Sequence, residues 1–378
     1  MKRTFKWIRS ALLMAGVSWL PLQALGGPIE DLKPGHWYEV PNSAMHGVIP
    51  NPPPPGVIGP ASIIGGASGG AFDTKRDRLL VWGGGHTDYS GNEVYAFDLN
   101  TLKWTRLTEP SKDVGGYERS GYYPDGQPRG RHTYDYVEYV PPIDSFCSFG
   151  AVTMYPNGNI FVGNTDCLDM KTLKWQRKAN ALSYGVSALS AFDPVTGHVW
   201  VHGAGNEGYL VEYLPLKDQW MVHGFRGIES GFTSYSMTAA LDPKRRKFVA
   251  VGNGNVTVWN LKDRGLKKGK SIKTTGDVGI ITSIAPGFVY DPILDKFVAW
   301  SGGADVYIFD LDKRLWKKRL ASPGNKVVPT LAHVRGTFGR FAYSPRKNVY
   351  VVVNHINENV FIYRLADGKK GKSQAARP

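Results

Sequence analysis

Val289-Tyr290-Asp291-Pro292, followed after four residues by Phe297-Val298-Ala299-Trp300, is the stretch that decides the fold. Both halves are rich in β-branched and aromatic residues, which favour strands. Asp-Pro favours a tight turn between them, because Pro fixes φ and Asp bonds its own backbone. The stretch therefore predicts two antiparallel strands joined by a turn. Five similar stretches begin at Ala71, Tyr139, Ala191, Ala240 and Ala342.

The turn recurs at a nearly constant interval. From the second copy onward it falls at residues 141, 193, 242, 291 and 344, with spacings of 52, 49, 49 and 53 residues. Such a period is typical of propeller blades, each of which is one small antiparallel sheet. We therefore predict an all-β propeller of six four-stranded blades. A seventh blade in residues 109–131 is the alternative, although Gly, Pro and charged residues there favour a loop.

The N-terminal part of the chain is predicted to close the ring. The sixth copy has a third strand at 360–365, after which the chain continues into a basic tail without a fourth strand. The residues His36-Trp37-Tyr38-Glu39-Val40 have the composition of the missing strand. Pairing the two ends of the chain in this way would remove the open sheet edges.

The second half of each unit carries a further resemblance. Val94 to Leu99 is followed by Trp104, and Val306 to Leu311 is followed by Trp316 at the same offset. Glycine runs precede both strands. A Gly doublet, then Tyr, then Trp resembles the kelch repeat, which implies four-stranded blades around a central channel.

Composition and the N-terminus bound the class of protein. The 378 residues include 45 Gly, 11 Trp and 42% hydrophobic residues, which excludes wholesale disorder and argues against a helical protein. Four basic residues precede an apolar run at 11–20 that is too short to span a bilayer. We interpret 1–26 as a signal peptide, with an uncut anchor as the alternative. We then expect a secreted or periplasmic propeller over 27–366 and a basic tail over 367–378.

The two cysteines are predicted to form a disulfide. Cys147 falls at the position of Leu80 on a second strand, and Cys167 at the position of Ala96 on a third strand. These positions would face each other across adjacent antiparallel strands, and an exported chain permits a disulfide. Two buried free thiols are the alternative.

Polar side chains gather in the loops that should open on one face of the ring. Five of the nine histidines map there: His86, His132, His202, His333 and His355. His86 follows three glycines, which let a backbone approach a ligand closely. Asp88 and Asn92 have an alternative role as caps of a tight hairpin, and His202 as an inner-strand residue. The candidate substrate-binding residues are Arg131, Tyr89, Asn92, Tyr134, His202, Tyr235, Arg335 and His355.

This set of residue types suits β-elimination on a uronate polysaccharide. Histidine and tyrosine form an acid/base pair, and arginine neutralises a carboxylate by bidentate bonding. Most glycosidases use two carboxylates, and no such pair is evident in the loops of this face. The formal charge of +14, about +10 once four basic residues of 1–26 are removed, favours an anionic polymer.

Gly83 to Asp98 together with Arg131-His132-Thr133-Tyr134 resembles secreted bacterial propeller polysaccharide lyases of the ulvan lyase type. The resemblance implies that His86 and His132, with Tyr184, act as base and acid. It also implies an arginine that neutralises the uronate, for which Arg131, Arg335 and Arg340 compete. Those lyases have seven blades, whereas six are counted here.

Two other hypotheses about the function stay open. One is a non-catalytic propeller that binds a glycan or a protein, because fold alone does not decide function. The other is an oxidase or hydrolase whose rim histidines hold a metal. We expect no required cofactor, although a bound structural or catalytic metal is the alternative. The expected partner is an anionic polysaccharide, with no nucleic acid, no membrane span after signal cleavage and a monomeric state.

Overall fold

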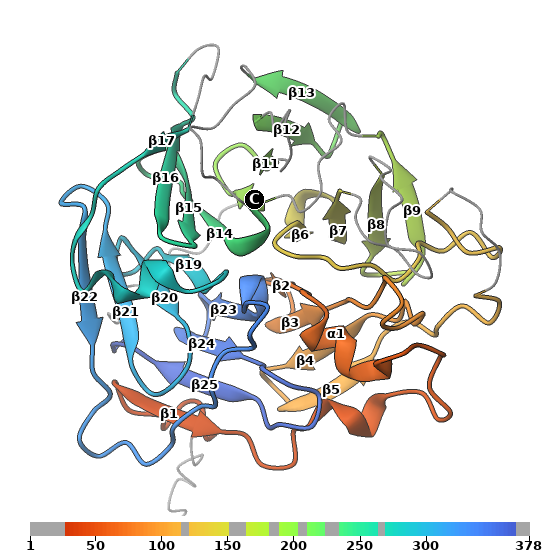
Figure 1. Ribbon diagram of the computed structural model, residues 1–378, viewed down its shortest axis with the longest axis horizontal. Helices are drawn as coiled ribbons and strands as arrows, with labels where there is room; N and C mark the ends of the chain where they lie inside the picture. Colours follow the sequence, from red (N-terminus) through yellow and green to blue (C-terminus); the bar gives the residue numbers. More distant parts are fainter. Residues whose placement is uncertain are drawn as a thin grey trace, which may run out of the picture.

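Six small sheets stand in a ring in the computed structural model, which describes residues 27–114, 121–150, 164–180, 189–202, 210–223, 234–263 and 269–367 (Figure 1). This is the six-bladed all-β propeller that the repeats predict. The predicted signal peptide, residues 368–378 of the tail, and Tyr184 lie outside the described residues.

The first three blades each pair four consecutive strands. Blade one contains β2 (Gly70–Asp73), β3 (Arg78–Val81), β4 (Tyr95–Asp98) and β5 (Lys103–Arg106). Blade two contains β6 (Val137–Val140), β7 (Ser145–Phe149), β8 (Thr165–Asp169) and β9 (Trp175–Lys178). Blade three contains β10 (Leu189–Asp193), β11 (His198–His202), β12 (Leu210–Leu214) and β13 (Gln219–His223).

The other three blades vary at their outer edges. Blade four contains β14 (Thr238–Asp242), β15 (Lys247–Gly252), β16 (Asn255–Asn260) and the short β17 (Lys270–Ser271). Blade five contains β19 (Gly287–Asp291), β20 (Lys296–Trp300), β21 (Val306–Asp310) and β22 (Leu315–Arg319), with β18 (Thr275–Gly276) added in parallel. Blade six contains β23 (Phe341–Ser344), β24 (Val349–Val352), β25 (Phe361–Arg364) and, from the other end of the chain, β1 (His36–Glu39).

The strand β1 closes the ring as predicted. It pairs antiparallel with β25, with His36 opposite Arg364 and Glu39 opposite Phe361. The buried Trp37 fixes this strand further, because its indole Nε1 donates to the carbonyl oxygen of Ala304 over 2.8 Å. No open edge therefore remains between blade six and its closing strand.

The turn between the first two strands has the same backbone geometry in every blade. One residue of each turn has a positive φ, between 45° and 75°: Asp77, Asp144, Gly197, Arg246, Asp295 and Asn348. Asp and Asn tolerate this left-handed conformation better than most side chains. In three blades a tyrosine five residues earlier donates its hydroxyl to that residue, as Tyr290 does to Asp295 over 2.6 Å. The repeated turn is thus the unit that the sequence copies.

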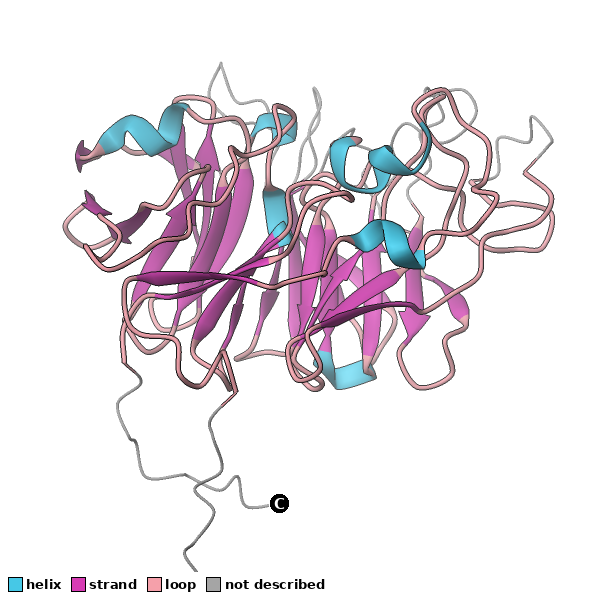
Figure 2. Ribbon diagram, turned by 90° about the horizontal axis from the view of Figure 1, so that it is seen from below, coloured by secondary structure: helices cyan, strands magenta, loops and turns pink. Residues whose placement is uncertain are grey.

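The two faces of the ring differ. Figure 2 shows most helical turns and long connections at one end of the strands, at the top of the view, which we call the upper face. The short turns between first and second strands form the lower face. The helical turns are α1 (Ser62–Gly65) and the 3-10 helices η1 (Met45–Val48), η2 (Gly59–Ala61), η3 (Pro141–Ile143), η4 (Ser234–Ser236), η5 (Val278–Thr282) and η6 (Phe338–Arg340). None of these helices in the described ranges is long and apolar enough to cross a membrane.

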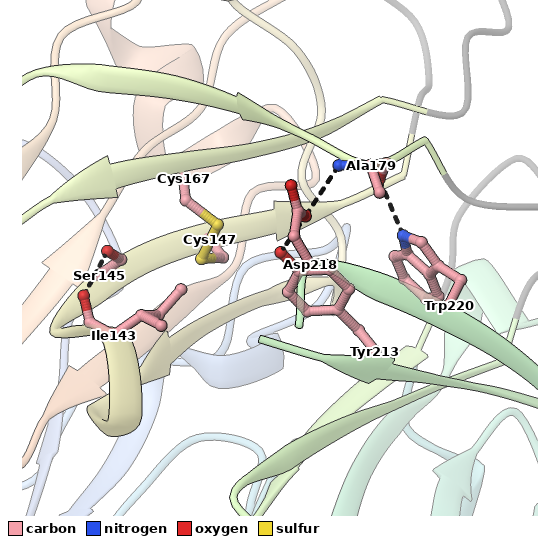
Figure 3. Close-up of a disulfide and its surroundings, with 8 residues drawn as sticks. All are labelled: Ile143, Ser145, Cys147, Cys167, Ala179, Tyr213, Asp218 and Trp220. Atoms are coloured by element: carbon pink, nitrogen blue, oxygen red, sulfur yellow. Dashed lines mark hydrogen bonds between the residues drawn. A yellow bond between two sulfur atoms is a disulfide. The ribbon is translucent and has the colours of Figure 1, made fainter. Parts of the chain in front are cut away.

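The predicted disulfide between Cys147 and Cys167 is confirmed. The two residues lie directly opposite each other on β7 and β8, and their Cα atoms are 4.1 Å apart (Figure 3). Both side chains are fully buried in the core between blades. The bond therefore joins the two middle strands of blade two. Most of the connection between these strands, 151–163, lies outside the described residues.

Candidate functional site

Three segments of the upper face bring polar side chains together beside the ring axis. The connection from β3 to β4 supplies His86 and Asp88, and the connection from β5 to β6 supplies His132. The connection from β22 to β23 supplies Arg335, which is 247 residues from Asp88 in sequence. These groups are far apart in the sequence, and the propeller fold brings them into one site.

Glycine shapes the loop that carries His86. A Cβ on Gly83 would lie 2.0 Å from the hydroxyl oxygen of Ser68, so only glycine fits there. Gly85 has a φ of 77° and His86 follows at 53°, both in the left-handed region. Such a conformation is uncommon for histidine and turns its side chain out of the strand direction. The loop is therefore built to present His86.

The segment before α1 braces this loop from outside. The carbonyl oxygen of Pro55 accepts from both the backbone N–H and the hydroxyl of Ser90. The backbone N–H groups of Ile58 and Gly59 donate to the carbonyl oxygen of Asp88 over 3.1 Å and 2.8 Å. The Pro-rich segment 50–60 thus holds Asp88 in place.

The two candidate catalytic histidines lie next to each other. The rings of His86 and His132 stack with centroids 5.6 Å apart and an interplanar angle of 30°. His132 is 6% exposed, whereas His86 is only partly buried. The two rings are therefore in contact, and His86 is the more accessible of the two.

Asp88 connects this pair to an arginine. One carboxylate oxygen, Oδ2, lies 3.2 Å from Nε2 of His132 and 3.4 Å from Nη1 of Arg335. Asp88 is buried, but the side chain of Arg335 is 48% exposed. Arg335 can therefore meet a ligand with the donors that Asp88 does not use.

The protonation states follow from these contacts. The hydrogen bond from His132, followed by the charge of Arg335, lowers the pKa of Asp88 and keeps it ionised. Burial lowers the pKa of His132, and the bond to Asp88 opposes that effect only in part. A neutral His132 that donates from Nε2 to a carboxylate has its lone pair on Nδ1. The geometry thus supplies an oriented base.

A second pair of histidines adjoins this group. Nδ1 of His333 accepts from the backbone N–H of Arg335 over 3.2 Å, and Nδ1 of His355 accepts from that of Asn357 over 3.1 Å. These bonds place the ring proton of each neutral histidine on Nε2. Burial and the nearby positive groups Arg340 and Arg335 lower the pKa of His333.

Several predicted contact residues lie beneath the surface instead. Arg131 is fully buried, with Nη2 3.2 Å from Oδ2 of Asp166 and its guanidinium over the ring of Trp82. Tyr89 is also buried and donates to Glu93 over 2.5 Å. These two side chains support the loops of the site from below.

Asn92 and His202 are buried as well. The Asn92 amide donates to Ser111 and to the carbonyl oxygen of Pro128, and its Oδ1 accepts from the N–H of Ser111. His202 lies against the Trp259 ring, and burial lowers its pKa to about 4. Asn92 therefore ties neighbouring loops together, and His202 belongs to the interior of blade three.

The remaining candidates differ in exposure. Tyr134 is partly buried, edge-on to His132 and to Phe338 at centroid distances of 6.0 Å. Tyr235 is 52% exposed in η4. The position of Tyr184 is outside the described residues, so its predicted role stays a prediction.

Three arginines are candidates for neutralising the uronate carboxylate, and of these Arg335 is the accessible one. Arg340 is fully buried, and its guanidinium donates to the carbonyl oxygens of Ser68, Gly336 and Val353. Burial lowers the pKa of Arg340 to about 9, which leaves it charged at neutral pH. Arg340 thus holds three upper-face segments together.

No family model matches this chain, and no curated protein matches it. The propeller fold is shown by the structure alone. Kelch membership and the likeness to ulvan lyases remain resemblances. The described ranges contain no group of three or more His, Cys, Asp or Glu side chains arranged to hold a metal ion.

Proposed function

We propose that the upper-face site is the active site of an exported polysaccharide lyase that acts on a uronate-containing polymer. The observation that carries this proposal is the convergence of His86, His132, Asp88 and Arg335 from three separate segments. The predicted signal peptide and the disulfide support export.

The reaction uses the site as follows. Nδ1 of His132 takes the C5 proton of the uronate, and Asp88 stabilises the imidazolium that forms. The electrons of the C5–H bond form the C4=C5 double bond as the C4–O bond breaks. The leaving oxygen takes a proton from His86 or from Tyr184. Arg335 offsets the charge that grows on the uronate carboxylate.

The test is an activity assay on a panel of uronate polymers, read as the ultraviolet absorbance of the new double bond. We expect product from at least one polymer and a loss of about 10²-fold or more in kcat for His132→Ala and His86→Ala. Arg335→Ala should mainly raise KM. The exposed His46 provides the matched control, His46→Ala, which should keep full activity.

Absence of product from every polymer, with folded protein, would reject the proposal. So would full activity in both histidine variants. Circular dichroism and thermal unfolding of each variant establish folding.

A non-catalytic binding propeller is the second candidate. It is favoured by exposed apolar side chains near the site, since Val57, Leu331 and Val334 are each more than 80% exposed. Such residues are common at binding surfaces. Polymer binding without product, retained in a His86/His132 double variant, would support this candidate instead.

A further inference from the structure

A cavity lies on the ring axis, between the inner strands of the six blades. It has a volume of about 930 Å³ and is lined by residues of the inner strands β2, β6, β10, β14, β19 and β23. The turn prolines Pro142, Pro194, Pro243, Pro292 and Pro345 line it at the lower face. This volume is within the range of small-molecule sites.

Several described segments on the upper side of the inner strands contact one another. The backbone N–H of Tyr134 donates to the carbonyl oxygen of Ala67, and those of Thr337 and Phe338 donate to the carbonyl oxygen of Ala285, so each bond joins the segments that lead into neighbouring blades. Ala67, Ala285 and Phe338 form a buried apolar cluster on which Tyr134 packs. The described lining of the cavity includes none of His86, Asp88, His132 and Arg335, so the cavity and the upper site are formed by different residues, and the turn prolines place the cavity toward the lower face.

The wall of the cavity is mainly apolar. Equivalent positions of successive blades contribute large side chains such as Phe72, Phe192, Leu241 and Tyr290. Two acidic residues, Asp135 and Glu138, interrupt this wall, and no Lys, Arg or His is among the described residues that line it. The cavity therefore combines an apolar body with two acidic side chains and, among the described lining residues, no basic one.

Both carboxylates are held but lack a cation. Oε1 of Glu138 accepts from the hydroxyl of Ser190 over 2.9 Å, and Oδ2 of Asp135 accepts from the N–H of Ala239 over 2.6 Å. Within the described ranges neither forms an ion pair within 4.0 Å. Glu138 is partly exposed, and because it lines the cavity that exposure faces the cavity.

We propose that this lower cavity binds an organic amine whose cationic group pairs with Glu138 and whose apolar body fills the channel. A carboxylate in an apolar wall is costly unless a cation accompanies it, and the lining provides none. Above neutral pH an anionic ligand would meet repulsion from the ionised Glu138. The cavity is thus distinct in ligand chemistry from the upper site, where the exposed Arg335 favours anions.

The test is a calorimetric titration of the full chain with phenylbutylamine at about pH 8, with phenylbutanol as the neutral counterpart. We expect saturable binding of the amine and binding of the alcohol about tenfold weaker or less. Glu138→Gln keeps an acceptor for Ser190 but removes the charge, and should weaken amine binding about tenfold or more. Glu109→Gln, an exposed acid on the outer side of blade one, is the matched control and should bind like the native protein.

A second variant guards against effects of Glu138→Gln on folding. Thr74 is exposed at the lower mouth, so Thr74→Trp narrows the entrance without altering the carboxylates. It should also weaken amine binding. Equal binding of amine and alcohol, native affinity in both variants, or no saturable amine binding would overturn the proposal. The titration does not read lyase activity, so its failure leaves the upper-site proposal standing.

Discussion

Arginines of the upper face show how contacts decide what a side chain does. Arg131 is buried against Asp166 and Trp82, and Arg340 is buried among three carbonyl oxygens. Arg335 alone of these three is about half exposed. The same residue type thus braces the fold at two positions and is available to a ligand at the third.

Asp88 is expected to act as a positioning residue for His132. Asp88→Asn should lower kcat about 10²-fold, because the imidazolium loses its partner. The carboxylate also raises the pKa of His132, so the acid limb of the pH profile should move to lower pH in the variant. A kcat–pH profile checks both effects, with Asp263→Asn in blade four as control. An unmoved acid limb would show that Asp88 only supports the loop.

The stability of the protein should fall as pH rises through the titration of Glu138. Burial raises the pKa of this carboxyl from 4.5 to about 7. Between these values the unfolded chain has lost the proton that the folded chain keeps, so the free energy of unfolding decreases with pH. We expect a decrease of about 3 kcal/mol across that window, which Glu138→Gln removes. Urea unfolding at several pH values measures it, and an identical pH dependence in both proteins would contradict the assignment.

At the scale of elements, the disulfide between β7 and β8 is expected to contribute to the free energy of unfolding. Cys147 and Cys167 are 20 residues apart, so reduction frees a loop of that length in the unfolded chain. Cys147→Ser with Cys167→Ser should lower the free energy of unfolding by about 3 kcal/mol. Denaturant unfolding measures this, with reductant added to the native protein as a parallel. Equal stability with and without the bond would refute the expectation.

The sequence predicted elements better than side-chain directions in loops. Strand pairs, the closing strand His36–Glu39 and the cysteine register follow from a hairpin that repeats with side chains alternating in period two. A loop has no such period. Tyr89 and Asn92 therefore looked like ligand contacts, although Glu93, Ser111 and Pro128 hold them inside. The partnership of Asp88 with His132, 44 residues away, also leaves no local signal.

At the scale of the whole molecule, ring closure rests on one strand. Trp37 of β1 is 3% exposed and packs on Trp300 and Tyr363. Trp37→Ala should lower the free energy of unfolding by about 4 kcal/mol, because it leaves a cavity at the seam. Val57→Ala, at an exposed position, is the control. Calorimetry reads both, and native stability in Trp37→Ala would show that the ring does not depend on this contact.

We propose that the upper face recognises an acidic sugar at the point where His132 can take its proton. A crystal structure of inactive His132→Ala soaked with a uronate oligosaccharide tests this most directly. We predict a sugar carboxylate bound to Arg335, with His86 against the same sugar and C5 facing the space left at position 132. An oligosaccharide seated elsewhere on the ring, with Arg335 and His86 untouched, would contradict the account.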